Sequence, residues 1–363
     1  MQDWRENNMV EWKKLDDVCT FKRGRTITAK DAIKGTVPVI AGGQTPSYYH
    51  NESNRTGESI TVAGSGAYAG FVAYWNQPIF VSDAFTVEPA EGILHKYVFH
   101  WLRMNQQRIF ETQKGAGVPH VHGKDIAGFV IPIPSLSEQT RIVGILDTFT
   151  ASIENLKQQI AERRKQYEHY RDQLLDLEGK EGVARIILKD VCEVINGRAY
   201  SQPELLSEGK YRVLRVGNFF SNDSWYYSDL ELEDKYYCES GDLLYAWSAS
   251  FGPHIWEEEK VIYHYHIWKM NCGEGLNKKY MYYWLQSEDM KRQAFTNLHG
   301  ATMAHLTKAL MESLMVPVPS IEEQSRIVSI LDTFEASIAN LEAQLKQREK
   351  QYEYYRNKLL TFD

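Results

Sequence analysis

The chain has 363 residues, which is enough for two domains and the connections between them. Hydrophobic residues make up 43% and charged residues 25%, as in an ordinary soluble globular protein, and no apolar run approaches the length of a membrane span. The formal net charge of −7 argues against a simple nucleic-acid binder. We expect the four cysteines to be buried and reduced, and the polar N-terminus does not resemble a signal peptide. The default expectation is therefore a cytoplasmic protein.

The charged residues are divided unevenly along the chain. Residues 1–131 carry 14 basic and 13 acidic side chains, whereas residues 178–316 carry 15 basic and 20 acidic ones. If DNA is the ligand, positive charge must be concentrated on one face or be supplied by a partner.

The chain contains two related halves. Residues 15–25 (LDDVCTFKRGR) match residues 188–198 (LKDVCEVINGR), so each half opens with the same short element and a Gly-Arg turn. Short strand-like runs follow in the same order. These runs are residues 36–41, 57–63 and 79–87, and residues 211–216, 241–247 and 262–270. A short helix around Tyr97 or Tyr280 and a strand of the pattern GFVIPIP or SLMVPVP complete each half, which predicts two copies of one α+β fold.

Basic and aromatic side chains are interleaved in the loops of both halves. Lys and Arg position a protein on phosphates, and small polar side chains can read base edges. The loop GSGAYAG at residues 64–70 lacks the Lys-Ser/Thr pair of a P-loop, so we expect it to face a ligand groove instead. Each residue alone could be a solvated surface group, and the pattern across both halves is what favours DNA contact. The DNA-contact candidates are Lys22, Arg23, Arg25, Ser65, Tyr68, Lys114, His120, Lys124, Arg198, Arg215, Trp247, Ser250, Phe251, His299, His305 and Lys308.

The sequence shows no catalytic or metal-binding set of its own. His120 and His122, like His264 and His266, are spaced so that a strand would place both on one face, but no Cys, Asp or Glu accompanies them at ligand spacing. No Ser-His-Asp or Cys-His set has supporting spacing, and no Asn-Pro-Pro-aromatic tetrapeptide occurs. We therefore predict no metal site and no catalytic residue.

A long segment occurs twice. Residues 132–175 and 317–360 are identical at 28 of 44 positions without a gap. Each copy begins with Pro-x-Pro-Ser, and Ser135 and Ser320 each have a Glu three residues later, the spacing of a helix capping box. Residues at alternating steps of four and three then form a coiled-coil seam. The seam residues are Phe149, Ile153, Leu156, Ile160, Arg163, Tyr167, Tyr170 and Leu174, and Phe334, Ile338, Leu341, Leu345, Arg348, Tyr352, Tyr355 and Leu359.

One seam position is arginine in both copies, Arg163 and Arg348. An isolated helix of this kind is marginally stable, so each helix needs a partner, and the other copy is the nearest candidate. Parallel pairing would place the two arginines together in a like-charge contact, so we predict an antiparallel coiled coil. The facing pairs are then Arg163 with Leu345, Arg348 with Ile160, Phe149 with Leu359, Tyr167 with Leu341, and Tyr352 with Leu156.

The repeated Pro-x-Pro-x4-Gln-x-x-Ile element, followed by a heptad helix after each of two diverged halves, resembles the specificity subunit of type I restriction–modification systems. The element spans residues 132–142 and 317–327, and the resemblance covers essentially the whole chain. It implies an α+β fold with two globular target-recognition domains separated by two long helices, which form an antiparallel coiled coil with pseudo-two-fold symmetry. The expected recognition domains are residues 1–131 and 179–316, and the expected spacer helices are residues 132–178 and 317–363.

The resemblance also implies a non-catalytic, DNA-binding role. Each head would read one half of a split, asymmetric site, and helices of about 30 residues, about 45 Å long, would act as a ruler between them. Two modification subunits with S-adenosylmethionine would dock on the helices, and restriction subunits with ATP and Mg would join them, so that no cofactor is expected in this chain. The partner-docking candidates are Gln139, Arg141, Gln324 and Arg326. The alternatives are a protein-binding scaffold with two heads on a coiled-coil spacer and, more weakly, an enzyme with an unrecognised site.

Overall fold

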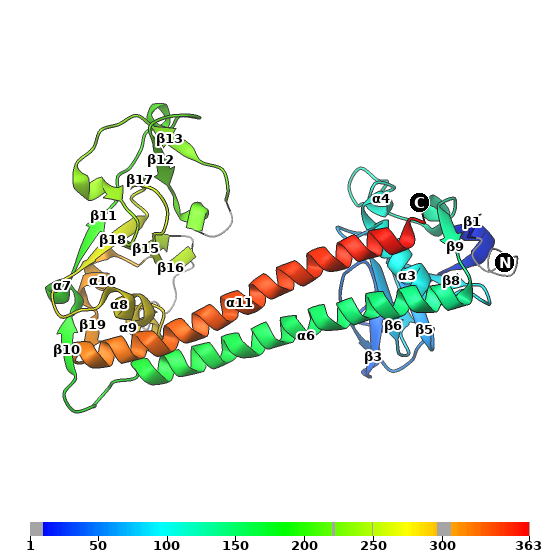
Figure 1. Cartoon of the computed structure of the whole chain (residues 1–363), viewed down its shortest axis with the longest axis horizontal. Coiled ribbons are helices and arrows are strands. Elements are labelled where there is room, and N and C mark those ends of the chain that lie inside the picture. The colour runs from blue at the N-terminus through cyan, green and yellow to red at the C-terminus, as the bar shows by residue number, and fades with distance from the viewer. Residues whose placement is uncertain (1–9, 220–221, 249, 296–305, 363) are drawn as a thin grey trace, which may run out of the picture. The chain divides into compact units, whose positions relative to one another are not determined.

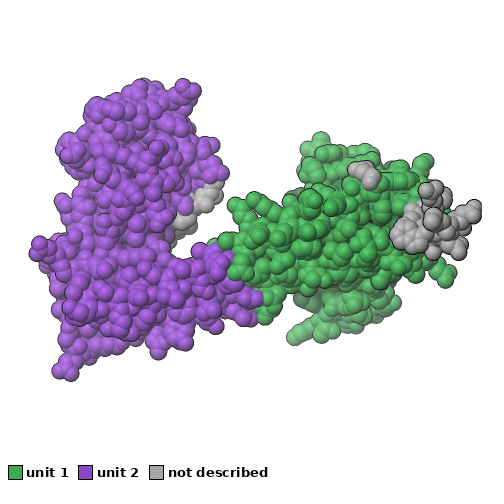
Figure 2. All heavy atoms as spheres, in the orientation of Figure 1, with its two compact units in different colours: residues 1–158, 342–363 green, residues 159–341 purple. Residues whose placement is uncertain are grey.

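The chain forms two compact units. The computed structural model describes residues 10–219, 222–248, 250–295 and 306–362. Unit 1 comprises residues 1–158 and 342–363, and unit 2 comprises residues 159–341 (Figure 2). Two helices of 40 residues each, α6 (Leu136–Leu175) and α11 (Ile321–Leu360), begin in one unit and end in the other (Figure 1). Within the described ranges, no helix is both long enough and apolar enough to cross a membrane.

The described residues of unit 1 form small sheets and short helices. β1 (Glu11–Lys14) pairs antiparallel with β9 (Val130–Ile133), the strand that leads into α6. A four-stranded sheet has the order β2-β8-β5-β6, and a three-stranded sheet has the order β4-β3-β7, in which β3 and β7 are parallel. The other elements are α2 (Leu15–Val18), β2 (Cys19–Arg23), β3 (Val37–Ile40), β4 (Tyr48–His50), β5 (Glu58–Ala63), β6 (Val72–Asn76), β7 (Phe80–Val81), β8 (Ala84–Pro89), α3 (His95–Met104), α4 (Gln106–Phe110) and α5 (Gly123–Ile126).

Unit 2 repeats this order of elements with one further strand, β14. β10 (Ala184–Ile187) pairs with β19 (Met315–Val318), which leads into α11. One sheet has the order β11-β18-β15-β16 and the other β13-β12-β17-β14, with β12 and β17 parallel. The other elements are α7 (Leu188–Val191), β11 (Cys192–Asn196), β12 (Tyr211–Leu214), β13 (Tyr226–Ser228), β14 (Tyr237–Cys238), β15 (Leu243–Ser248), β16 (Ser250–Ile255), β17 (Val261–Tyr263), β18 (Ile267–Cys272), α8 (Lys278–Trp284), α9 (Glu288–Phe295) and α10 (Lys308–Ser313). The predicted pair of related α+β units is confirmed.

The strands expected at residues 79–87 and 262–270 are each broken in two, which corrects the sequence interpretation. β7 and β8 belong to different sheets and are separated by residues 82–83, and β17 and β18 are separated by residues 264–266. Each apolar run contributes to more than one core cluster, because the chain leaves one sheet and enters the other within it. The break puts polar side chains at the end of two sheets in both units.

A buried tyrosine ties the short helix of each unit to the strand before the long helix. Tyr97 of α3 donates its hydroxyl to the Pro132 carbonyl at 2.7 Å, and Tyr280 of α8 donates to the Pro317 carbonyl at 2.7 Å. Both tyrosines are fully buried, and a buried hydroxyl needs such an acceptor. The contact holds the start of α6 or α11 against its own unit.

The long helices run antiparallel, as predicted. In unit 1, Phe149 of α6 stacks on Tyr355 of α11 with ring centroids 5.3 Å apart, and in unit 2 Tyr170 stacks on Phe334 at 5.4 Å. Each contact pairs the first half of one helix with the last turns of the other. Tyr355 lies one helical turn before Leu359, which was the predicted neighbour of Phe149.

The seam arginines rest on aromatic rings, and their positions show that the predicted register was wrong. The Arg163 guanidinium lies 5.8 Å from the centroid of the Phe334 ring, and that of Arg348 lies 5.7 Å from the Phe149 ring. The prediction set Arg163 opposite Leu345, whereas the stacks of Phe149 on Tyr355 and of Tyr170 on Phe334 shift the pairing by one helical turn and set Arg163 opposite Leu341. The predicted register differs because a guanidinium can stack on an aromatic face while its methylene groups cover apolar surface. The arginine therefore packs within the seam and does not interrupt it.

Each long helix ends in the core of the unit opposite to the one in which it begins. Leu360 is 1% exposed and lies in the unit 1 core with Leu146, and Leu175 is 1% exposed and lies in the unit 2 core with Leu331. With 40 residues each helix is about 60 Å long, longer than the predicted 45 Å. Neither unit is therefore complete without the helix that arrives from the other.

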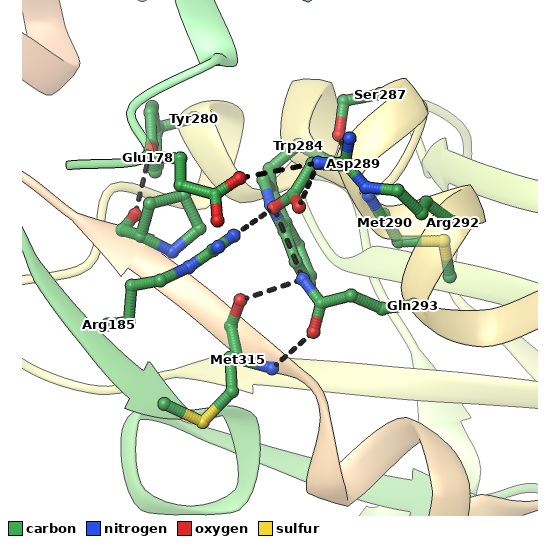
Figure 3. A network of polar contacts seen from close by, with 11 residues as sticks. Glu178, Arg185, Tyr280, Trp284, Ser287, Asp289, Met290, Arg292, Gln293 and Met315 are labelled. Atoms are coloured by element: carbon green, nitrogen blue, oxygen red, sulfur yellow. Dashed lines mark hydrogen bonds and ion pairs between the residues drawn. The ribbon is translucent and has the colours of Figure 1, made fainter. Parts of the chain in front are cut away.

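A polar network in unit 2 joins β10, α8 and α9 to β19. Figure 3 shows the Asp289 carboxylate between Arg185 of β10 and Trp284 of α8, with Arg292 and Gln293 beside it. Arg185 donates to Asp289 at 2.5 Å, and Trp284, Arg292 and Gln293 each donate at 3.2 Å. Asp289 is 9% exposed, so these donors compensate for its loss of hydration.

The variant Asp289→Asn is expected to lower the free energy of unfolding by about 2 kcal/mol near pH 7, because it leaves Arg185 without its anion. Burial alone would raise the pKa of Asp289, but hydrogen bonds from Arg185 and Trp284 hold it below its ordinary value of 3.8. The stabilisation is therefore complete above about pH 4 and is lost as the pH falls through the lower, folded-state pKa. Urea denaturation at several pH values checks this.

The matched control is Glu288→Gln, because the neighbouring Glu288 side chain is 67% exposed and pairs with Lys291. This variant is expected to change the free energy of unfolding by less than about 0.5 kcal/mol. Equal denaturation midpoints for the two variants near pH 7 would show that the Asp289 network does not stabilise unit 2.

Candidate nucleic-acid interface

The Gly-Arg turn occupies the same place in both units. Arg25 N–H donates to the Val81 carbonyl at 3.0 Å, and Arg198 N–H donates to the Tyr263 carbonyl at 3.1 Å. A side chain on Gly24 would lie 2.2 Å from a backbone carbonyl oxygen, and one on residue 197 would lie 2.4 Å from another. Only glycine permits this close approach, which fixes the arginine beside the break between the two sheets.

A groove of about 570 Å³ lies next to this turn in unit 1. Four of the predicted residues line it, namely Arg23, Ser65, His120 and Lys124. They come from β2, from the loop after β5, and from the segment around α5. Backbone bonds hold the two loops together: Gly66 N–H donates to the Pro119 carbonyl at 3.0 Å and Val121 N–H to the Gly64 carbonyl at 3.1 Å. The sequence pattern thus identified groups that the fold does bring together.

The predicted cations of unit 1 differ in whether they already have an anionic partner. Lys22 pairs with Glu88, and Lys114 pairs with Asp125 at 2.5 Å. Burial alone would raise the pKa of Asp125, but hydrogen bonds from Lys114 and the His122 N–H lower it, so this pair is ionised near neutral pH. Arg23 and Lys124 are exposed and form no ion pair with any residue in the described ranges.

Two further candidates of unit 1 lie at the surface near these cations. The Arg25 guanidinium is 5.1 Å from the centroid of the Phe80 ring. Tyr68, in the loop that contributes Ser65, is 46% exposed. The phenol ring of Tyr68 is thus presented to solvent on the same loop that lines the groove.

Two of the three predicted cations of unit 2 already form ion pairs within the unit. Arg198 pairs with Glu204 at 2.6 Å, and hydrogen bonds from Arg198 and Ser201 lower the pKa of Glu204 to about 2. Lys308 pairs with Glu312 at 3.4 Å. Arg215 is exposed, and its guanidinium stacks 5.3 Å from the Tyr226 ring centroid.

Trp247 occupies in unit 2 the backbone position that Gly64 has in unit 1. Gly64 N–H donates to the Asp83 carbonyl at 3.0 Å, and Trp247 N–H donates to the His266 carbonyl at 3.1 Å. The Trp247 ring stacks on Trp268 with centroids 5.6 Å apart and meets His266 edge-on at 5.0 Å. An indole and an imidazole therefore stand at the backbone positions that Gly64 and Asp83 occupy in unit 1.

The histidine between the two sheets of unit 2 is neutral near pH 7. Burial, with smaller effects from His266 and Arg215, lowers the pKa of His264 to about 4. Phe251 lies across the β15–β16 hairpin from Trp247 and is 37% exposed. The side chain of Ser250, and the candidates His299 and His305, lie outside the described residues.

Two of the predicted partner-docking residues have a different role, which is a correction. Gln139 and Gln324 are 1% and 0% exposed. Gln139 accepts from the Leu94 N–H at 3.0 Å and donates to the Pro134 carbonyl at 3.0 Å, and Gln324 makes the equivalent bonds to Asn277 and Pro319. These amides brace the start of the long helix against its own unit and are not accessible to a partner.

The other two docking candidates, Arg141 and Arg326, are exposed on the first turns of α6 and α11. Arg141 donates to Glu138 at 2.7 Å, and Arg326 donates to Glu323 at 2.7 Å. The glutamates of the predicted capping boxes are therefore used in ion pairs, while the serine hydroxyls accept from the Glu138 and Glu323 N–H groups at 3.3 Å. Both units present the same charged pair at the same helical position.

Sequence reasoning missed one polar group at the groove, Asp83, and the aromatic environment of Trp247. Matching the run 57–63 to the run 241–247 end to end sets Ala63 against Trp247, which is one residue out of step with the strand pairing of β5 and β15. Matching Ala63 to Ala246 instead would have brought Gly64 opposite Trp247. In the described part of the chain, no three His, Cys, Asp or Glu side chains are grouped so that they could bind a metal ion.

The fold and site define a class of protein with two homologous α+β units, unlike surface residues at matching places, and two matching helices that connect them. A family model for the type I restriction modification DNA specificity domain matches residues 9–163 and 180–350. The chain belongs to this family. It is a DNA specificity subunit with two target-recognition domains, the non-catalytic component of a type I restriction–modification complex.

Two curated relatives are similar to the chain over nearly its whole length. A putative type I restriction enzyme specificity subunit of Haemophilus influenzae is 28% identical, with 98% of this chain and 97% of that protein covered. The EcoR124I/EcoR124II specificity subunit of Escherichia coli is also 28% identical, with 97% and 94% covered.

Solved structures share the fold. The S subunit of a type I system from M. genitalium superposes with a TM-score of 0.64 at 18% identity and covers 98% of this chain and 96% of that one. A chain from a structural study of complex assembly and conformational transition in the type I R-M system gives a TM-score of 0.59 at 18% identity, with 96% and 97% covered.

Proposed function

We propose that each unit reads one half of a bipartite, asymmetric DNA sequence, and that α6 and α11 set the gap between the halves. One observation carries this proposal: the two units share the same framework residues but differ in the residues near the break between their two sheets. The helix pairing, the Gly-Arg turn and the buried amides recur in both units, whereas Gly64 and Asp83 of unit 1 are replaced by Trp247 and His266 in unit 2. Two readers with one framework and different surface groups would select two different base sequences.

The proposed division of labour follows the predicted boundaries. Residues 1–131 and 179–316 would be the recognition domains, and residues 132–178 and 317–363 would form the spacer. Among the cations, Arg23, Arg25, Lys124 and Arg215 would contact phosphates most strongly, because they do not first have to leave an anionic partner within the described residues. The paired residues Lys22, Lys114, Arg198 and Lys308 would contribute less, since a phosphate would compete with a carboxylate that is already in contact.

Partners and cofactors complete the proposal. Two modification subunits would dock on the long helices and adjoining surfaces, where Arg141 and Arg326 present equivalent charged pairs. S-adenosylmethionine would be bound by those subunits, and ATP and Mg by the restriction subunits, with no cofactor held by this chain. A complex that acts on genomic DNA would be cytoplasmic.

Replacing Lys124 by alanine is expected to lower DNA affinity severalfold and to reduce the salt dependence of binding. Each phosphate contact that is lost lowers the slope of log K against log salt concentration by about 0.9. The matched variant Lys22→Ala removes a side chain that is 60% exposed but already pairs with Glu88, so it should change both quantities less. Titrations of duplex DNA at several salt concentrations measure them. An effect of Lys22→Ala equal to that of Lys124→Ala would contradict the proposed ranking.

Deleting one heptad from each helix, Ile153–Gln159 and Ile338–Gln344, is expected to shorten the gap in the recognised sequence by about three base pairs. Seven residues correspond to about 10 Å of helix, and base pairs are about 3.4 Å apart. Both deletions lie between the ring contacts at Phe149 and at Phe334, so the anchored ends of the antiparallel pair are kept. Mapping of methylated adenines in cells that carry the complete system measures the gap.

The reciprocal control duplicates the same two heptads, which should lengthen the gap by about three base pairs. Deleting the heptad from α6 alone would put the helices out of register and should abolish site-specific methylation. A gap that stays the same after the double deletion would refute the spacer role while leaving DNA recognition by the two units intact.

A further inference from the structure

Asp83 is an acidic group in an otherwise basic groove. It lies in the two-residue break between β7 and β8, next to the Gly-Arg turn. Among the described residues that line the unit 1 groove, Asp83 alone is acidic, whereas Arg23 and Lys124 are basic and His120 and His122 are imidazoles. A carboxylate would repel a phosphate at this place. Its position therefore needs an explanation other than contact with the DNA backbone.

The environment of Asp83 leaves it ready to accept a hydrogen bond. Ser65 donates its hydroxyl to Oδ2 of Asp83, and Asp83 forms no ion pair with any residue in the described ranges. The residue is exposed, and a side chain on Gly64 would lie 3.2 Å from Oδ1, so the glycine leaves space on that side of the carboxylate. Oδ1 thus lies on the side of Gly64, which also lines the groove, while Ser65 orients the carboxylate through Oδ2.

The chemistry of base edges limits what such a group can recognise. In the major groove, cytosine presents the N4 amino group and adenine presents the N6 amino group, whereas guanine O6 and N7 and thymine O4 are acceptors. A carboxylate can only accept, so it favours an amino group and disfavours the acceptor edges. Asp and Glu side chains pair most simply with cytosine N4, because adenine offers an acceptor at N7 beside its donor.

We propose that Asp83, oriented by Ser65, is a specificity-determining residue that selects an amino group, cytosine above all, at one base pair of the half-site read by unit 1. This assignment rests on the proposed reading of one half-site by each unit. In unit 2 the equivalent backbone position is His266, beside Trp247, and it carries no carboxylate. The acceptor therefore belongs to one half-site only.

The test uses the full chain in its complete restriction–modification system with restriction disabled, and maps methylated adenines in the host genome. Asp83→Asn replaces one carboxylate oxygen by an amino donor at nearly constant size. It is expected to reduce the preference for cytosine at one base pair by about tenfold or more, with thymine or guanine gained there, and to leave the other half-site unchanged. Glu91→Gln, a change at an exposed carboxylate outside the groove, should leave both half-sites unchanged.

The outcomes separate this assignment from the proposed function. A split motif that is identical for Asp83→Asn and the parent overturns the role of Asp83 alone, whereas a motif that is not split overturns the reading of two half-sites. If Asp83→Asn abolishes methylation, the methylated motif of the variant Ser65→Ala tests the assignment instead. This variant keeps the carboxylate but frees its orientation, so a weaker preference at one base pair supports the assignment and an unchanged motif refutes it.

Discussion

The antiparallel pairing of α6 and α11 is the interaction on which the rest of the structure depends. Each helix starts against its own unit through a buried glutamine, and it ends with a leucine in the core of the other unit. Aromatic stacks and arginine–ring contacts hold the pair at both places. Each unit therefore contains the beginning of one long helix and the end of the other.

The same constraint explains which parts of the sequence repeat. The helices must match each other along the seam and brace equivalent units, so the residues that do this recur: a tyrosine bonded to the last proline of the preceding strand, an amide at the helix start, and an arginine over a phenylalanine. The residues at the break between the two sheets do not have to match in this way. Residues 82–83 and 264–266 can differ in length and chemistry without disturbing the framework, and this is where the units diverge.

Much of this could be predicted from the sequence, and the remainder failed for identifiable physical reasons. Heptad spacing predicted the helices, and like-charge repulsion predicted their direction. The register was wrong because Arg163 stacks on Phe334 instead of merely avoiding charge. The bracing role of Gln139 could not be predicted, because its partners, the Leu94 N–H and the Pro134 carbonyl, are backbone groups that no side-chain pattern reveals. Asp83 was not predicted, because it lies within residues 79–87, an apolar run whose pattern is typical of a single strand.

The central claim is that the two units of this chain recognise two different base sequences in one DNA molecule. The measurement that tests it most directly is a map of methylated adenines in the genome of cells that carry the unaltered system. The account predicts a motif with two specific blocks of different sequence, separated by a fixed number of unspecified base pairs. A single contiguous motif, two identical blocks, or a gap that varies from site to site would contradict it.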